Sequence, residues 1–497
     1  MRVLFFLLIL GMIVSTNHIA LAKAKARVHK KPAKQLILPT IYGAYELQNA
    51  LNRLIMAKGQ ATDMTVFVKS MQTGDVLYRY NVNQPLTPAS AMKIFTAESA
   101  LLYLGPGYRF STQLLTDAKS VKKGVLQGNL YIVLSGDPTL TYHDLADLFL
   151  SLKTQQIRAI AGNVYIDDTA YDQRFYGPGW QWEDKNYCYA APIGAGIVNR
   201  NCLSFQVAPS KVSGRAATVM TSPNYYYPTI RNGVVTKTSR SRHCSVRLSG
   251  DPGNAITIDG CMPKGRYAWG VSYVINDLPE YNRSLFKNLL YRLSVSIYGR
   301  VTFRSIPDNL SLIGSHSSKP LPILINEMLK KSDNIIAGAL FKKIGQLYTR
   351  QQGSWENGSF AVSQILAKRA GVNISGMRIL DGSGLSPDNL ATGAQMMQVL
   401  NFAYHHGPTS NEFITALPIA GVDGTLKHRL GHIARKVRAK TGTISGVVSL
   451  AGYAMSKDKE LLAFVIMING NRGLGWRYKS LEDSIATALT RYTRELT

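Results

Sequence analysis

The chain has 497 residues, of which 45% are hydrophobic and 18% charged, so it can bury a sizeable core in two or three domains. Its 57 Lys and Arg against 30 Asp and Glu give a formal net charge of +27. Nucleic acid is the usual partner of such charge, but the start of the chain indicates export and argues against it. An anionic envelope surface is one alternative, and a solvated basic surface without a dedicated partner is the other.

The first 22 residues are typical of a cleaved secretory signal peptide. Arg2 precedes an apolar run from Val3 to Val14, and Ala20-Leu21-Ala22 matches a small-x-small cleavage site. The alternative is a membrane anchor, but the run is too short for a hydrocarbon core of about 30 Å. Residues 23 to 36 are rich in lysine and predict a flexible basic arm. We therefore predict a periplasmic protein.

The next part of the chain predicts a helix and a hairpin. Residues 43 to 58 carry leucines at helical spacing. Thr65 to Val68 and Val76 to Tyr80 alternate in polarity on either side of Thr73-Gly74-Asp75, which is typical of a hairpin. Residues 37 to 112 are predicted to form the first part of one domain.

Residues 113 to 286 differ in composition and periodicity from the rest of the chain. Gly, Pro, Tyr and Ser become frequent, short alternating runs such as Leu130 to Leu134 appear, and helical periodicity mostly disappears. This pattern predicts an insertion made of one or two small β-rich domains.

The four cysteines all lie inside this predicted insertion. An even number of cysteines in an exported protein indicates disulfides. Pairing of Cys188 with Cys202 and of Cys244 with Cys261 is the simplest of three connectivities. A zinc site is the alternative, but neither pair has the short gap typical of zinc ligands.

The end of the chain repeats the elements of its start in reverse order. Gly446 to Met455 and Leu461 to Ile468 predict strands joined by a turn at 456 to 460, and a helix is predicted from Leu481 to about Leu496. Residues 287 to 497 would complete the domain begun by residues 37 to 112. An antiparallel sheet joined from both ends and covered by helices is the expected α+β fold.

A Ser-x-x-Lys pair stands at the start of a predicted helix that ends before Gly105. Thr87 is a suitable N-cap for this helix, and Ser90 and Lys93 would share one face of it. A serine hydroxyl needs an adjacent base to act as a nucleophile, and a lysine whose pKa is lowered can be that base. A solvent-facing pair with no function is the alternative.

Two further short motifs follow much later in the chain. Ser332-Asp333-Asn334 lies between helix-like stretches at 321 to 330 and 335 to 344, where a helix N-cap is the alternative interpretation. Lys440-Thr441-Gly442-Thr443 precedes a strand-like run, where an ordinary turn is the alternative. In this motif Gly442 would let a ligand lie close against the strand.

Taken together, the three motifs resemble the signature of the penicillin-recognising serine acyl transferases. The chain is most similar to the low-molecular-mass class C D-alanyl-D-alanine carboxypeptidases of the penicillin-binding protein 4 type, peptidase family S13, which carry a large β-rich insertion between the first two motifs. Further stretches with this resemblance are Leu134 to Leu140, Gly177 to Trp180, Asn199 to Asn201, Asp381 to Ser386 and Gly421 to Leu426.

The resemblance implies a β-lactamase/transpeptidase-like fold, with helices on both faces of an antiparallel sheet. It implies a serine-type D-Ala-D-Ala carboxypeptidase, also acting as a DD-endopeptidase on cross-links, that β-lactam antibiotics acylate. The substrates would be peptidoglycan stem peptides, with no metal or other cofactor.

The resemblance also assigns catalytic roles. Ser90 would be acylated and Lys93 would take its proton, while Ser332 would pass a proton to the leaving amine beside Lys440. Asn334 would orient Lys93 and the substrate amide. Backbone N–H groups of Ser90 and Thr443 would form the oxyanion hole.

The remaining implied contacts concern substrate binding. The terminal carboxylate would be held by the residues that flank Gly442: Lys440, Thr441 and Thr443. Asp184 could pair with the amine of the diamino acid and Tyr189 could pack on its aliphatic stem, although a loop acid and a core aromatic are the alternatives. In some relatives a basic residue follows the stretch that ends at Ser386, whereas this chain has Pro387-Asp388.

Overall fold

The computed structural model describes residues 39–58, 62–223, 225–238, 243–251, 254–405, 407–470, 473 and 475–494. The predicted signal peptide and the predicted basic arm lie outside these residues. None of the helices in the described ranges is long and apolar enough to cross a membrane.

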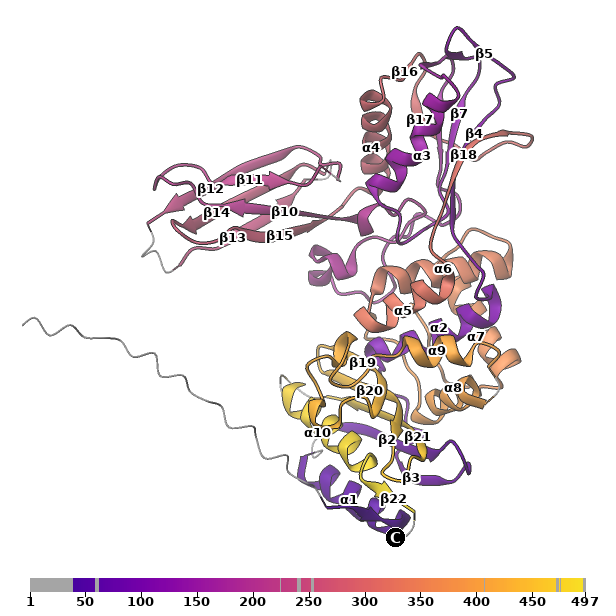
Figure 1. The fold of residues 1–497 in the computed structure, drawn as a ribbon, viewed down its shortest axis with the longest axis vertical. Coiled ribbons are helices and arrows are strands. Elements are labelled where there is room, and N and C mark those ends of the chain that lie inside the picture. The colour runs from indigo at the N-terminus through magenta and orange to yellow at the C-terminus, as the bar shows by residue number, and fades with distance from the viewer. Residues whose placement is uncertain are drawn as a thin grey trace, which may run out of the picture. The chain divides into compact units, whose positions relative to one another are not determined.

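A five-stranded antiparallel sheet joins the two ends of the chain, as expected (Figure 1). Its order is β19-β20-β21-β2-β3, so that β2 from the start of the chain pairs with β21 from its end. The central strands are buried along almost their whole length, because helices cover both faces. The strands are β2 (Asp63–Ser70), β3 (Val76–Tyr80), β19 (Val437–Ile444), β20 (Val447–Met455) and β21 (Leu461–Asn469).

The side chains of β21 alternate between two cores. Phe464 and Ile466 pack with α1 (Gly43–Lys58) and α10 (Gly475–Leu489) on one face. Val465 packs into the other core, which α2, α5, α6, α7, α8 and α9 complete. These helices are α2 (Lys93–Leu104), α5 (Leu321–Lys331), α6 (Asn334–Thr349), α7 (Trp355–Ala370), α8 (Gly393–His405) and α9 (Ser410–Ala416). The expected α+β fold with helices on both faces is confirmed.

The last helix differs from its prediction at both ends. It begins at Gly475 and ends at Leu489, whereas the sequence predicted 481 to 496. The chain then turns into β22 (Tyr492–Thr493), which pairs in parallel with β1 (Ile41–Tyr42). Because Tyr492 and Thr493 pair with β1, the helix ends at Leu489 and does not continue as the periodicity of the final residues predicted.

A second five-stranded sheet, of order β17-β9-β7-β4-β18, is formed by residues that lie in sequence between α2 and α5. Two helices pack on it around Phe149 and Phe286, although the sequence showed little helical periodicity there. The elements are β4 (Ser111–Thr116), β7 (Leu130–Val133), α3 (Tyr142–Thr154), β9 (Val164–Asp167), α4 (Leu278–Arg292), β17 (Val301–Phe303) and β18 (Ser311–Ser317). A small sheet of β5 (Val121–Lys122), β6 (Val125–Leu126), β8 (Ala159–Ile160) and β16 (Ser296–Ile297) adjoins it.

The pairing of β18 with β4 bears on the extent of the insertion. The predicted range of 113 to 286 ends inside α4, whereas β17 and β18 still pair with strands of the inserted sheet. We therefore propose that the insertion runs from Ser111 to Ser317.

Two three-stranded sheets form the outer part of the insertion and share one apolar core. Disulfides join Cys188 to Cys202 and Cys244 to Cys261, which confirms the pairing of cysteines close in sequence. The strands are β10 (Cys202–Ala208), β11 (Thr218–Thr221), β12 (Ile230–Lys237), β13 (Val246–Gly250), β14 (Ile256–Pro263) and β15 (Trp269–Val274).

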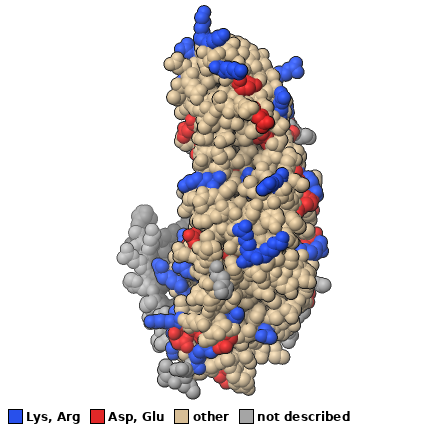
Figure 2. All heavy atoms as spheres, turned by 90° about the vertical axis from the view of Figure 1, so that its right-hand side faces the viewer, with Lys and Arg blue, Asp and Glu red and all other residues tan. Residues whose placement is uncertain are grey.

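Basic side chains are scattered over the face drawn in Figure 2 and do not gather into one patch there. This distribution on that face is what a solvated basic surface would give.

Candidate active site

Ser90 lies on a short 3-10 turn, η1 (Ala89–Met92), that leads directly into α2. Ala89 has a φ of +47°, a left-handed conformation that costs free energy for a residue with a Cβ. The predicted N-cap was wrong, because Pro88 occupies the cap position and Thr87 donates its hydroxyl to the carbonyl of Pro387 at 2.8 Å. Tertiary contacts therefore hold the turn that presents Ser90.

Lys93 is the first residue of α2 and its side chain is fully buried. Its Nζ lies 2.9 Å from Ser90 Oγ and donates to Asn334 Oδ1 at 2.7 Å and to the Ser383 carbonyl at 2.6 Å. Burial lowers the pKa of Lys93 to about 7, and the charge of Asp381 opposes this shift. A large fraction of Lys93 is therefore neutral near pH 7, and it contacts the serine whose proton a base would take.

Asp381 is a fully buried carboxylate that organises the loop beside Lys93. Its oxygens accept from the backbone N–H groups of Ser383 at 3.0 Å, Gly384 at 2.6 Å and Ser386 at 2.9 Å. The indole N–H of Trp180, which comes from the insertion, donates to the same carboxylate at 2.5 Å. These bonds fix the position of the Ser383 carbonyl that accepts from Lys93.

Ser332, at the cleft surface, forms a second hydrogen-bonded pair with the buried Lys440. Ser332 ends α5 in a left-handed conformation, φ +59°, and its Oγ lies 2.9 Å from Lys440 Nζ. Lys440 extends from β19 and is fully buried. Burial, and then the charge of Lys93, lower the pKa of Lys440 well below its usual range. Burial and mutual repulsion thus disfavour a state in which both lysines are charged.

The helix cap suggested for Ser332-Asp333-Asn334 is also present, at its middle residue. Asp333 caps α6 by accepting from the N–H of Ile336 at 2.9 Å. Because the cap uses only Asp333, the side chains of Ser332 and Asn334 remain directed to Lys440 and Lys93.

Gly442 lets β19 approach the segment that carries Ser90. A Cβ at this position would lie 2.1 Å from Ser449 Oγ, 2.8 Å from the Pro88 carbonyl and 3.0 Å from Ser90 N. The sequence-based interpretation that Gly442 leaves room for a ligand was therefore wrong in detail. Protein atoms occupy that space, and the glycine sets the distance between β19 and η1.

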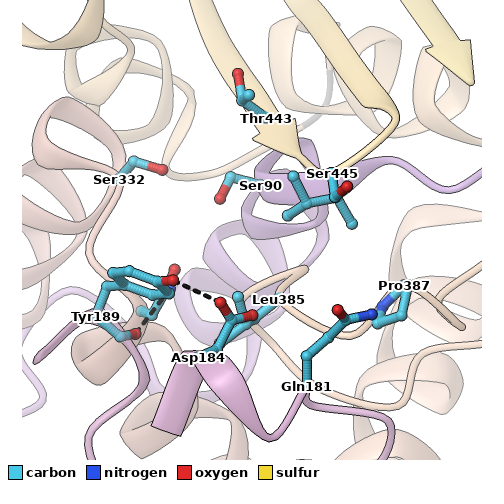
Figure 3. Close-up of a pocket in the computed structure, with 11 residues that line it drawn as sticks. Ser90, Gln181, Asp184, Tyr189, Ser332, Leu385, Pro387, Thr443 and Ser445 are labelled. Carbon is cyan, nitrogen blue, oxygen red and sulfur yellow. Dashed lines mark hydrogen bonds between the residues drawn. The ribbon is translucent and has the colours of Figure 1, made fainter. Parts of the chain in front are cut away.

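One cleft of about 360 Å³ is lined by four of the predicted catalytic and carboxylate-binding residues: Ser90, Ser332, Asn334 and Thr443 (Figure 3). Of the other predicted site residues, Lys93, Lys440 and Gly442 are buried behind its wall. The hydroxyl of Thr441 donates to Thr425 Oγ1 at 2.7 Å.

Asp184 and Tyr189 lie on the opposite wall of the same cleft (Figure 3). The Tyr189 hydroxyl donates to Asp184 Oδ1 at 2.5 Å, and Asn334 Nδ2 donates to the Tyr189 carbonyl at 2.9 Å. Burial and Asp184 raise the pKa of Tyr189. Its ring is 47% exposed and stacks on Tyr187, so the alternative of a core aromatic is wrong.

Five lining residues were not among the predicted site residues. Leu385 and Pro387 lie in or just after the Asp381 loop, and Ile444 and Ser445 directly follow Thr443, so proximity in sequence to a motif was an available signal. Gln181 carried no such signal beyond its place after Trp180.

Comparison with known proteins shows the family. Residues 47–491 match the D-Ala-D-Ala carboxypeptidase 3 (S13) family. The chain is 31% identical over 415 residues to the D-alanyl-D-alanine carboxypeptidase DacB of Haemophilus influenzae, which covers 83% of this chain and 86% of that protein. It is also 31% identical over 443 residues to a D-alanyl-D-alanine carboxypeptidase of Actinomadura sp., covering 86% and 81% of the two chains.

A solved structure agrees with this assignment. Penicillin binding protein 4 (dacB) from Haemophilus influenzae superposes with a TM-score of 0.80 at 30% identity, over 89% of this chain and 99% of that one. The same protein complexed with a β-lactam gives a TM-score of 0.74 at 28% identity, with the same coverage. The chain therefore belongs to the D-Ala-D-Ala carboxypeptidase 3 (S13) family and is a serine D-Ala-D-Ala carboxypeptidase.

Proposed function

We propose that Ser90 is the residue acylated by stem peptides of peptidoglycan that end in D-Ala-D-Ala, and that the same site cleaves DD cross-links as an endopeptidase. The observation that carries this proposal is the contact of Ser90 Oγ with Lys93, a buried lysine whose pKa is lowered to about 7. A serine becomes a nucleophile when such a base takes its proton.

In the first step, neutral Lys93 accepts the proton of Ser90 while Ser90 Oγ attacks the carbonyl of the penultimate D-Ala. The developing oxyanion is stabilised by the N–H groups of Ser90 and Thr443, because β19 and η1 lie close together at Gly442. Removal of one such donor typically costs about 3 kcal/mol in the barrier. Asn334 holds Lys93 in position through its Oδ1.

In the second step, the amide bond breaks and the leaving amine needs a proton. Ser332 donates its hydroxyl proton and recovers one from Lys440, with which it is hydrogen-bonded. The proton gained by Lys93 and the proton lost by Lys440 leave the total charge of the lysine pair unchanged. Water then hydrolyses the ester on Ser90, and the lysines return to their starting states.

The terminal carboxylate of the substrate is held by β19. Thr443 lines the cleft and is exposed, and its hydroxyl, which donates to the Gly442 carbonyl at 2.7 Å, would turn to this carboxylate on binding. Thr441 and Lys440 lie behind Thr443. They would help to stabilise the substrate carboxylate, Thr441 through its hydroxyl and Lys440 through its positive charge. Pro387 lines the cleft, and this chain has Pro387-Asp388 where some relatives have a basic residue. The contact with the substrate carboxylate is therefore left to residues of β19.

Asp184 and Tyr189 are proposed to recognise the diamino acid of the stem peptide. Both lie in the wall opposite Thr443, and the carboxylate of Asp184 is close to solvent (Figure 3). The amine of the diamino acid would pair with Asp184, and its aliphatic stem would pack on the ring of Tyr189. The two disulfides favour the oxidising periplasm as the compartment.

Covalent labelling with a fluorescent penicillin tests the role of Ser90. We expect a labelled band for the wild type, none for Ser90→Ala, and an unchanged band for Ser249→Ala, an exposed serine on β13. Labelling that persists in Ser90→Ala would contradict the proposed nucleophile.

Digestion of purified muropeptides, followed by mass spectrometry, tests the two reactions separately. Loss of one D-Ala from pentapeptides reports carboxypeptidase activity, and conversion of cross-linked dimers to monomers reports endopeptidase activity. Both are expected for the wild type and neither for Ser90→Ala. Intact dimers after complete trimming of pentapeptides would refute the endopeptidase proposal alone.

A further inference from the structure

A second pocket, of about 590 Å³, lies where the insertion meets α5. It shares no lining residue with the cleft that contains Ser90. Its walls come from α3 and the loop before it, from η4 (Asn199–Asn201), from the end of β18 and from α5. The charged or titratable lining residues are Asp144, Arg200, Tyr225, His316, Lys319 and Glu327.

Asn199 gives this pocket a polar group without a partner. Its side chain is 8% exposed and lines the pocket, and among the described residues its Nδ2 has no hydrogen-bond partner. Its Oδ1 accepts from the N–H of Tyr142 at 3.1 Å, which fixes the direction of the amide. A buried donor left unsatisfied costs about 1–3 kcal/mol, so an acceptor supplied by a ligand would be stabilising.

Lys319 gives the pocket a cation that is free to bind an anion. It is exposed, lies at the end of β18 and pairs with no carboxylate in the described part of the chain. Arg200 differs, because it pairs with Asp333 and lies 3.5 Å from Glu327. Lys319 is therefore a donor that a ligand carboxylate could reach without breaking an existing contact, and Asn199 Nδ2, buried in the pocket wall, is a second donor that lacks an acceptor among the described residues.

The lining also carries negative charge. Asp144 and Glu327 line the pocket together with the permanent cations Arg200 and Lys319, so the lining carries equal numbers of each charge. Asp144 Oδ2 also accepts from the Thr141 hydroxyl at 2.6 Å, and Glu327 Oε1 also pairs with Lys331 at 2.8 Å. His316 Nε2 lies 3.9 Å from the buried Asp137, which is a further acid beside the pocket. A balanced lining disfavours a ligand of one charge and favours one that carries both.

We propose that this pocket is a second, non-catalytic binding site for a zwitterionic amino acid or peptide end. The ligand carboxylate would contact Lys319 and Asn199, and its ammonium would face Glu327 and Asp144. The stem peptides on which this family acts carry both groups. The site would hold such a peptide apart from the one in the catalytic cleft.

Peptide binding to enzyme whose cleft is blocked tests this proposal. The protein is first acylated with penicillin, and complete acylation is verified by mass spectrometry. Isothermal titration with the tetrapeptide L-Ala-γ-D-Glu-diaminopimelate-D-Ala then reports binding outside the cleft. We expect saturable binding, weakened about tenfold or more in Lys319→Glu because the charge of a carboxylate contact is reversed. Lys287→Glu, an exposed charge reversal on α4, is the matched control and should bind as the wild type.

Two further arms identify the ligand chemistry. Free D-alanine binding competitively with the tetrapeptide would assign the site to the released product, and binding of the tetrapeptide alone would assign it to the stem peptide. A tetrapeptide with its amines acetylated and its carboxylates amidated should not bind. No binding to the acylated wild type, or equal binding by Lys319→Glu, would overturn the proposal. Failure of acylation itself would instead contradict the role of Ser90. The titration is then run on the unacylated Ser90→Ala and Ser90→Ala/Lys319→Glu proteins, in which the open cleft adds a binding site, so one site fewer is expected in the double variant and equal stoichiometry and affinity would overturn the proposal.

Discussion

The pH dependence of acylation is the sharpest consequence of the buried Lys93. Only the neutral amine can take the proton of Ser90, and burial lowers the pKa of Lys93 from 10.5 to about 7. The rate of acylation should therefore rise with pH, with a midpoint near pH 7, until the loss of the proton of Lys440, whose pKa is also lowered, limits proton donation to the leaving amine. A lysine with its usual pKa would instead give a rate that still rises at pH 9.

The expected size of the change follows from the fraction of neutral Lys93. With a pKa of about 7, about 1% of the amine is neutral at pH 5 and about 90% at pH 8, so the rate should rise about ninetyfold. With the usual pKa of 10.5, only about 0.03% would be neutral at pH 7. Burial thus makes about 50% of the amine neutral at pH 7, roughly 1,600 times more of the base form, at the cost of a weaker base.

Stopped-flow measurement of acylation by a chromogenic β-lactam between pH 5 and pH 9 checks this expectation. The negative charge of Asp381 raises the pKa of Lys93, so Asp381→Asn should move the midpoint to lower pH. Asp458→Asn, at the turn between β20 and β21, should leave it unchanged. A rate that is flat across this range, or one without a midpoint near 7 that still rises at pH 9, would refute the assignment of Lys93 as the base.

Three other variants probe the surroundings of the site. Gly442→Ala forces β19 away from η1, so acylation should fall about tenfold or more, whereas Gly270→Ala, with open space at its Cβ, should acylate as the wild type. Trp180→Phe removes a donor from the buried Asp381 and should lower stability by about 2 kcal/mol in chemical denaturation. Burial raises the pKa of Glu98 to about 8, so folding favours its protonated form and stability falls as pH rises from 4.5 to 8. Glu98→Gln should therefore raise the thermal midpoint more at pH 8 than at pH 5, and an equal shift at both would contradict the buried acid.

The sequence was a reliable guide where a pattern had one structural solution. The alternation in β2 and β21 and the amphipathic helix at residues 43 to 58 predicted a sheet with helices on both faces, because each of these elements must bury one face. The cysteine pairs were also predictable, since each spans a short stretch of chain. The end of α10 was not, because its limit is set by the pairing of Tyr492 with Ile41, which is distant in sequence.

For the candidate site, the motifs indicated which residues lie together but not which atoms are in contact. The contacts of Lys93 with Ser90 and Asn334 follow the expected grouping. The reason for Gly442 could not be read from the chain, because the atoms that fill its Cβ position come from Pro88 and Ser449, which no local pattern connects. The cap at Asp333 was visible in the sequence, where it was the alternative to the catalytic interpretation, whereas in the structure Asp333 caps α6 while Ser332 and Asn334 contact Lys440 and Lys93.

The insertion is better described as part of the active site than as an appendage. Its Trp180 donates to Asp381, its Tyr189 carbonyl accepts from Asn334, and its Arg200 pairs with Asp333. In each contact the partner residue either contacts Lys93 itself or lies no more than two positions in sequence from a residue that contacts Lys93 or Lys440. Because buried charges at these points would be costly without their partners, a chain that lost the insertion would also lose the geometry of its lysines. The residues between the first and second motifs therefore help to hold the surroundings of both lysines in place.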